Sequence, residues 1–195
     1  MPKSALVMLE QIAGEVEAAA GEAVRDQVMA GSQSLTSKTS PAEIALFVKA
    51  AIDRLDAVLP EATGREIMGN CGYHCTRVNY TAIQRGINRR LKHKSEEDFL
   101  TAEMRKPQAG TRLEREGQTL YQIYKPQAFT RPMRCFCGLM RGLPSDVQVS
   151  PTYCGCSHRF VKTYWEEVLG RQVQVELLES AISGGVECKF KIELG

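Results

Sequence analysis

Six of the seven cysteines in this chain of 195 residues fall into three close pairs. The pairs are Cys71 and Cys75 in MGNCGYHC, Cys135 and Cys137 in RCFCG, and Cys154 and Cys156 in YCGCSH. Thiolates are ligands that suit zinc and iron–sulfur clusters, and four of them complete a tetrahedral zinc site. The three pairs therefore predict metal binding or thiol chemistry for at least two of them, with structural packing as the alternative.

The first pair has a spacing that fits a helix. Residues at i and i+4 share a helical face, so the thiols of Cys71 and Cys75 could reach one ion, and His74 could join them. The same two cysteines also continue an apolar stripe with Ile67 and Val78. Free cysteine packs well as a small hydrophobe, so the sequence leaves both interpretations open.

The two C-x-C pairs lie beside turn-forming residues. Gly138 follows one pair and Gly155 lies inside the other. In an extended segment i and i+2 point to the same side, and in a turn they can grip one ion. The usual zinc-ribbon spacing is C-x₂-C, so C-x-C is weaker evidence for zinc. Six thiolates exceed one zinc, which leaves open whether the pairs form one site or two.

The YCGCSH stretch precedes a predicted helix and offers more than thiols. A cysteine at a helix N-terminus is expected to have a lowered pKa, which suits a nucleophile as well as a metal ligand. His158 could be a ligand or a general base near Cys156, although a histidine at a helix start more often caps the helix or is solvated. Tyr153 is a further candidate for contact with a ligand.

The composition sets limits on the class of protein. Net charge is +2 and the pI is about 8.1, which is too mild to predict nucleic-acid binding. The first residues lack the continuous apolar stretch of a signal peptide, and no segment is apolar enough to span a membrane. We therefore expect a cytoplasmic protein, where thiols stay reduced and a disulfide framework is not expected.

The first half of the chain predicts helices over residues 5–29, 41–58 and 63–78. Ser40, Pro41 and Glu43 match an N-cap, a first helical position and a capping box. Ser95 is expected to cap a further short helix. Between these helices, RGINRRLKHK (85–94) carries five basic residues, interpreted as a solvated helix face, with phosphate or nucleic-acid binding as the alternative.

The second half predicts strands around one helix. A hairpin over residues 111–126 turns at Gly117, a helix spans 157–169, and strands over 172–180 and 187–194 flank an SGG turn. Cys188 shares the inward face of the last strand with Phe190, Ile192 and Leu194. Phe160, Tyr164 and Trp165 are expected in the core, one of them at a pocket. The predicted fold class is α+β: a helical N-terminal half, then an antiparallel sheet with a packed helix.

The stretch YCGCSHRFVKTYWEEVLGRQVQVELLESAISGGVECKFKI resembles the end of the 4-vinyl-reductase domain. CGYHC and GGVECKF are also similar to segments of bacterial proteins related to L-2-amino-thiazoline-4-carboxylic acid hydrolases. The resemblance covers about 40 residues well and residues 65–195 loosely. It implies an α+β ligand-binding fold, similar to small-molecule sensors and transport-particle subunits. It divides the chain into an N-terminal helical segment (1–62) and a ligand-binding domain (63–195), with one continuous domain as the alternative.

The resemblance also implies a zinc site beside the ligand pocket. Cys156 or Cys154 would correspond to the cysteine before the helix, and Cys188 to the last ligand. The middle cysteine of the pattern falls at Ser180, which is a departure. The acidic ligand would fall near Glu176 or Glu179, and Cys71, Cys75, Cys135 and Cys137 are the candidates to replace the missing cysteine.

These observations predict a bacterial, cytoplasmic protein that binds a small molecule beside a cysteine-held metal, most simply zinc. One alternative is a hydrolase that attacks a C=N bond with a thiolate or metal-bound water, and another is an iron–sulfur or redox protein. Whether it is an enzyme stays open, no catalytic residue is assigned, and a homodimer is an option. The candidate metal ligands are Cys71, Cys75, Cys135, Cys137, Cys154 and Cys156. The candidate ligand-binding residues are His74, Tyr153, His158 and Cys188.

Overall fold

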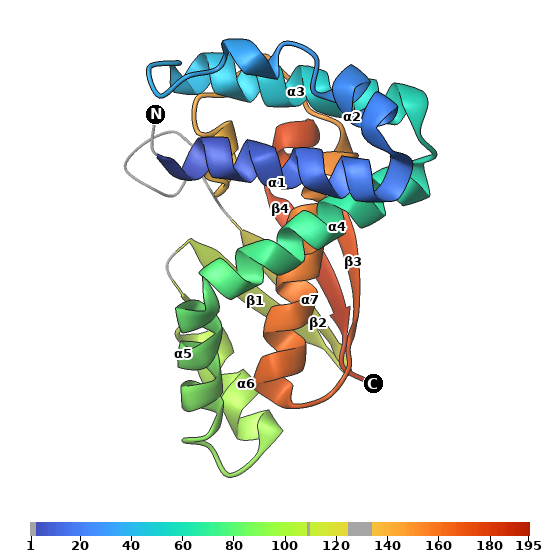
Figure 1. Cartoon of the computed structure of the whole chain (residues 1–195). Helices are drawn as coiled ribbons and strands as arrows, with labels where there is room; N and C mark the ends of the chain where they lie inside the picture. The colour runs from blue at the N-terminus through green and yellow to red at the C-terminus, as the bar shows by residue number, and fades with distance from the viewer. Residues whose placement is uncertain (1–2, 109, 125–133) are drawn as a thin grey trace.

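The chain adopts an α+β fold, seen in a computed structural model that describes residues 3–108, 110–124 and 134–195 (Figure 1). Helices make up the first half, and a four-stranded antiparallel sheet with a packed helix makes up most of the second half. The predicted fold class is therefore confirmed. Within the described residues, no helix is both long and apolar enough to cross a membrane.

The elements follow one another along the chain in the order predicted, with two differences that are given below. The α-helices are α1 (Lys3–Ala20), α2 (Glu22–Val28), α3 (Pro41–Val58), α4 (Glu61–Val78), α5 (Tyr80–Arg90), α6 (Glu96–Arg105) and α7 (Gly155–Leu169). The strands are β1 (Thr111–Glu116), β2 (Thr119–Tyr124), β3 (Gln174–Glu179) and β4 (Cys188–Glu193). Short 3₁₀ turns are η1 (Ser32–Ser34), η3 (Gly138–Met140), η4 (Pro151–Cys154) and η5 (Ala181–Ser183).

Two helix predictions needed correction. The predicted helix over residues 5–29 is two helices, because the chain breaks at Gly21, whose φ of 86° lies in the region that favours glycine. The basic segment 85–94, expected to form a solvated helix face, is helical only in its first six residues, which form the end of α5. The predicted ends of the other helices agree to within two residues, and the Ser40–Glu43 capping box is present.

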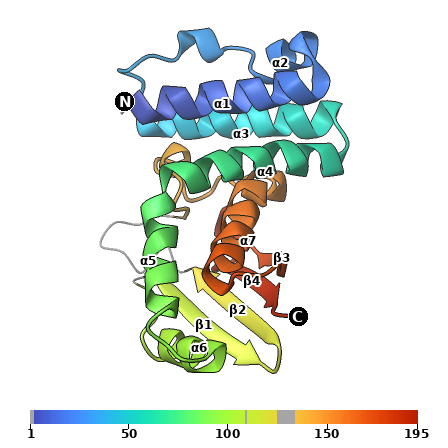
Figure 2. The same cartoon turned by 60° about the horizontal axis from the view of Figure 1, so that its bottom comes forward.

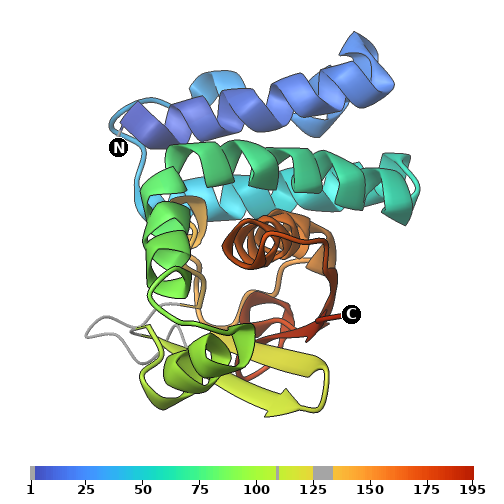
Figure 3. The same cartoon turned by 90° about the horizontal axis from the view of Figure 1, so that it is seen from below.

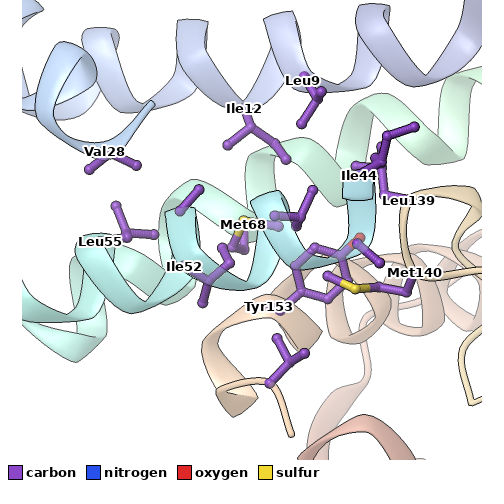
Figure 4. Packing of buried hydrophobic residues seen from close by; sticks show 14 of the residues in the cluster. Leu9, Ile12, Val28, Ile44, Ile52, Leu55, Met68, Leu139, Met140 and Tyr153 are labelled. Carbon is purple, nitrogen blue, oxygen red and sulfur yellow. The ribbon is translucent and has the colours of Figure 1, made fainter. Parts of the chain in front are cut away.

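The first helices enclose one apolar core. Residues of α1, α3 and α4 meet side chains of η3 and η4 there, as Figure 4 shows for Ile12, Ile52, Met140 and Tyr153. Burying such side chains contributes roughly 1.5–3 kcal/mol each relative to exposure, so this core holds η3 and η4 against the helices. Both C-x-C pairs border these turns, so the core also fixes their position.

The sheet has the strand order β1-β2-β4-β3, and every neighbouring pair is antiparallel. The predicted hairpin is present through Tyr124, and its turn uses Gly117 at a φ of 59°; residues 125–126 of that prediction lie outside the described residues. On β4 and just after it, Phe190, Ile192 and Leu194 are buried and Cys188 is partly buried. The predicted inward face of the last strand is therefore confirmed.

Helix α7 connects the two halves of the molecule. Its buried side chains join those of the sheet in a second core, and its first turns lie against α4. Figure 2 shows α5 beside α7, and in Figure 3 α7 (orange) lies between α4 and the strands. Helix α4, which begins at the predicted domain boundary, contacts both α1 and α7. The predicted division at residue 62 stays a prediction.

Candidate functional site

All seven cysteines are described, and each of them is a free thiol. They come from four places that the fold brings together: Cys71 and Cys75 on α4, Cys135 and Cys137 just before η3, Cys154 and Cys156 at the junction of η4 and α7, and Cys188 at the start of β4. Only Cys154 is fully buried, and the others are partly buried. The junction of α4 with the start of α7 is the centre of this arrangement.

Helix α4 meets α7 at Gly72, between the two cysteines of the first pair. A Cβ atom at Gly72 would lie 2.3 Å from the carbonyl oxygen of Cys156 and 2.8 Å from its Cα. No side chain larger than hydrogen fits there without a shift of the backbone. The close approach places Cys156 between the turns of α4 that carry Cys71 and Cys75.

The Cys135–Cys137 segment is fastened to the same junction through Tyr153. The buried Tyr153 hydroxyl donates a hydrogen bond of 3.0 Å to the Cys137 sulfur. The Cys135 sulfur accepts a 3.4 Å bond from the Cys137 backbone N–H, so this C-x-C forms a turn. Cys135, Cys137 and Cys156 all pack against the helical core. The bond from Tyr153 therefore links the Cys135–Cys137 segment to the turn that carries Cys154.

The remaining two thiols lie beside the segment that links β3 to β4. The Cys154 sulfur lies 3.1 Å from the Ser180 hydroxyl oxygen, and the Cys188 sulfur accepts a 3.5 Å bond from the backbone N–H of Ala181. Ser180, where the resemblance leads one to expect a cysteine, therefore adjoins Cys154. It is Cys154, and not Cys156, that lies next to this position.

The electrostatics of the thiols show which of them are neighbours. Burial raises the pKa of Cys156 well above its ordinary value, and the nearby thiols of Cys137, Cys75, Cys135 and Cys71 raise it further. Burial likewise raises the pKa of Cys71 to about 12, with smaller contributions that include Cys137 and Cys75. Cys137 acts in the same way on Cys75. Cys156 thus lies within electrostatic reach of Cys71, Cys75, Cys135 and Cys137. We call Cys71, Cys75, Cys137 and Cys156 the thiol cluster, and leave out Cys135 because Cys154 and Cys188 also act on its pKa.

The expectation of a lowered pKa at the start of α7 is wrong. Burial raises the pKa of Cys154 to about 11, although its bond with Ser180 acts in the opposite direction. Burial also dominates at Cys156. Desolvation disfavours the thiolate, whereas the dipole at the N-terminus of α7 favours it. At Cys154 and Cys156 desolvation is the larger of the two effects. In the protein as it stands these thiols are protonated and are poor nucleophiles.

The thiol cluster has the chemistry of a metal site, but its side chains do not converge on one point. Soft sulfur donors suit zinc, and four of them match its tetrahedral preference. Among the described residues, however, no three His, Cys, Asp or Glu side chains are placed to hold a metal ion together. Binding an ion would require these side chains to rearrange so that their sulfurs point at one place.

The predicted histidines do not lie with the thiols in the described contacts. His158 Nε2 lies 2.7 Å from the carbonyl oxygen of Val175, so its contact is with β3 and it ties the helix to the sheet. His74 is partly exposed on α4, and no described hydrogen bond joins it to a cysteine. Tyr153, in contrast, contacts Cys137 directly.

Of the two candidate acidic ligands, Glu179 lies near a cysteine: burial raises the pKa of Cys188, and the charge of Glu179 raises it further. Glu179 accepts backbone hydrogen bonds of 2.6 and 3.2 Å from Val186 and Glu187, so it holds the turn before β4. Glu176 is exposed on β3. Neither carboxylate contacts a cysteine in the described hydrogen bonds.

A small cavity is bounded by α5, α6, α7 and the β1–β2 hairpin. It has a volume of about 60 Å³, and Phe160, Tyr164 and Trp165 all line it, where the sequence predicted one pocket aromatic. Phe160 follows Cys156 by one helical turn. Tyr124, from β2, also lines the cavity, and its ring contacts that of Phe136 at 5.2 Å between centroids. Helix α7 and the contact of Tyr124 with Phe136 therefore connect the cavity to the cysteine segments.

Sequence reasoning missed the polar residues of this cavity. Glu103 is buried and forms two hydrogen bonds, of 2.7 and 3.0 Å, with the guanidinium of Arg89. Arg89 thus points inward, in contrast to the solvated face predicted for its segment. Gln122 is buried on β2 and accepts a 2.6 Å bond from the indole N–H of Trp165. The one available signal was Gln122, a polar residue at an inward strand position between Leu120 and Tyr124.

Comparison with known proteins gives a family but no activity. A family of unknown function (DUF6144) matches residues 4–195, nearly the whole chain. No curated protein matches the chain. The resemblance to the 4-vinyl-reductase family therefore stays a prediction.

Proposed function

Since the chain belongs to the DUF6144 family, whose function is unknown, we propose a function from its geometry: it binds a small molecule beside a thiol-held metal ion. The proposed ion is zinc, and the proposed ligands are Cys71, Cys75, Cys137 and Cys156. The observation that supports this most is the approach of three cysteine-bearing segments: Cys156 packs against α4 at Gly72, and Tyr153, next to Cys154, binds the sulfur of Cys137.

The chemistry of the donors favours a thiophilic ion. Zinc takes four thiolates in tetrahedral structural sites, whereas magnesium and calcium prefer oxygen ligands. Metal binding would release protons from thiols whose pKa burial raises, so affinity should increase with pH. The proposed location is the cytoplasm, because seven free thiols persist best in a reducing compartment.

The cavity supports the small-molecule part of the proposal. It lies next to the cysteine segments through Tyr124 and Phe136, as the resemblance to metal-containing small-molecule sensors leads one to expect. The hydrolase alternative has less support, because burial raises the pKa of both thiols at the start of α7 and so disfavours their thiolate forms. A free thiol nucleophile would need a lowered pKa and access to solvent.

The test is the metal content of the purified protein and its dependence on two pairs of cysteines. Elemental analysis should find about one zinc per chain without visible colour, whereas a brown protein would indicate an iron–sulfur cluster. The double variant Cys71→Ser/Cys156→Ser should lose the ion, because serine stays protonated and binds zinc poorly. Circular dichroism should show that each variant remains folded.

The matched control is Cys154→Ser/Cys188→Ser, which changes two thiols outside the thiol cluster. This control should keep the ion. Loss of zinc from the control, with retention in the first variant, would move the site to the segment before β4. Protein that stays metal-free after growth and dialysis with zinc would contradict the metal part of the proposal.

A further inference from the structure

The cavity between α5, α6, α7 and the β1–β2 hairpin has the size of a very small molecule. Its volume is about 60 Å³. One water needs about 10–15 Å³ measured in this way, so the space holds about four to six atoms of that size. The walls of Tyr124, Phe160 and Trp165 are aromatic rings, which favour a planar occupant.

One wall of the cavity offers a hydrogen-bond donor. The Tyr164 hydroxyl oxygen accepts a 3.0 Å bond from Arg89 and a 3.1 Å bond from Gln108. Both lone pairs of this oxygen are therefore in use. Within the described residues these two donors are its hydrogen-bond partners, so its own hydrogen can be given to an occupant of the cavity.

A hydrogen-bond acceptor lies next to that donor. Gln108 gives its amide N–H to Tyr164, and its carbonyl oxygen is on the same amide group at the exposed rim of the cavity. A donor and an acceptor side by side complement a group that presents C=O and N–H on one edge. A cis-amide, as in a lactam ring, has this edge.

The charges around the cavity favour a neutral occupant. The buried carboxylate of Glu103 is paired with the guanidinium of Arg89 through both of its oxygens. A charged ligand would have to compete with this pair or be buried without a partner, which is costly.

We infer that this cavity binds a small, neutral, planar cyclic amide, held by the Tyr164 hydroxyl and the Gln108 carbonyl between aromatic rings. The inference rests on the small-molecule part of the proposed function and names its ligand class. It does not need the metal, so the two can be tested apart.

The chain carries its own reporter for this site. Trp165 is the only tryptophan in the sequence, and it lines the cavity. We propose to titrate 2-pyrrolidone, a six-atom lactam, while following tryptophan fluorescence, with cyclopentanone as the control that has the same ring size and lacks the N–H. The lactam should cause a saturable change at millimolar concentrations, since ligands of this size bind weakly.

Cyclopentanone should bind roughly tenfold more weakly, because it leaves the Gln108 carbonyl without its partner. Tyr164→Phe should weaken lactam binding by a similar factor. Ala82→Leu, which adds bulk at a cavity-lining position of α5, should abolish it, while Thr81→Leu on the exposed side of the same helix should not.

Two results would overturn the inference: no saturable change up to about 100 mM lactam, or an unchanged response in Ala82→Leu. The same titration in folded Cys71→Ser/Cys156→Ser separates it from the metal proposal. If the protein binds the lactam but holds no zinc, the inference about the cavity stands and the metal proposal fails. If it holds zinc but does not bind the lactam, the inference about the cavity fails and the metal proposal stands.

Discussion

The sulfur of Cys154 lies 3.1 Å from the hydroxyl oxygen of Ser180, in a buried contact between residues 26 positions apart. On the other side of Ser180, the Ala181 N–H binds the sulfur of Cys188. Cys154, Ser180 and Cys188, three positions that the predicted resemblance would relate to zinc ligands, thus lie around one segment. Two of them carry thiols here, and the third carries a hydroxyl.

Ser180→Cys should complete a second thiol group at this segment. The new sulfur would lie beside Cys154 and near Cys188, and three thiolates suit a zinc ion. We expect zinc content, measured by elemental analysis after dialysis, to rise by about one ion per chain. Ser145→Cys, which adds an exposed thiol, should leave it unchanged. An equal rise in both variants would point to adventitious binding by any added thiol.

Gly72→Ala should destabilise the protein by separating α4 from α7. The added methyl would lie 2.3 Å from the Cys156 carbonyl oxygen, so the helices must move. The expected loss is on the order of 1–3 kcal/mol in the free energy of unfolding, measured with urea. Gly69→Ala is the control, because its nearest neighbour would be an ordinary 3.8 Å contact. That variant should be neutral or more stable by up to about 1 kcal/mol. Equal effects would show that α4 and α7 are not in tight contact.

The reduced, metal-free protein should lose stability in alkaline solution. Burial raises the pKa of Cys154 to about 11 and that of Cys71 to about 12, above the ordinary value of 9.0. A raised pKa contributes stability that is complete below the unfolded value and is lost as pH rises through the folded one. The loss should therefore occur between about pH 9 and 12, with a slope of up to about 1.4 kcal/mol per pH unit for each thiol.

Urea unfolding at pH 8 and pH 10, with a reductant and a chelator, measures this dependence. Cys154→Ser should show a shallower fall than the unaltered protein, because serine does not titrate in this range. Since other groups titrate alike in both proteins, identical slopes would mean that Cys154 is solvated and not buried.

Glu103→Gln should cost more stability than the loss of a surface ion pair. Glu103 is buried, and its charge faces the partly buried guanidinium of Arg89. Removing that charge weakens two charge-assisted bonds, with an expected loss of roughly 1–3 kcal/mol in the free energy of unfolding. Asp53→Asn, which breaks the exposed pair with Lys49 on α3, should cost less than about 0.5 kcal/mol. Thermal denaturation of both variants in one buffer decides the comparison.

The sequence by itself determined most of the local structure. Ser40 and Glu43 marked the start of α3, Gly117 marked a turn, and the alternation after Cys188 predicted the inward face of β4. These features depend on residues within a few positions of one another, so propensity and periodicity suffice to find them. The break at Gly21 was missed, because a single glycine is tolerated within many helices.

Tertiary structure alone decided which cysteines are neighbours and which polar groups are buried together. Cys71 and Cys156 meet because Gly72 lets two helices touch, and no sequence pattern specifies that contact. The cavity likewise joins Glu103, Gln108 and Tyr164 from separate elements. The direction of the thiol pKa shifts also depends on tertiary structure. The sequence shows that Cys154 lies at a helix start, but its desolvation depends on all the residues packed around it.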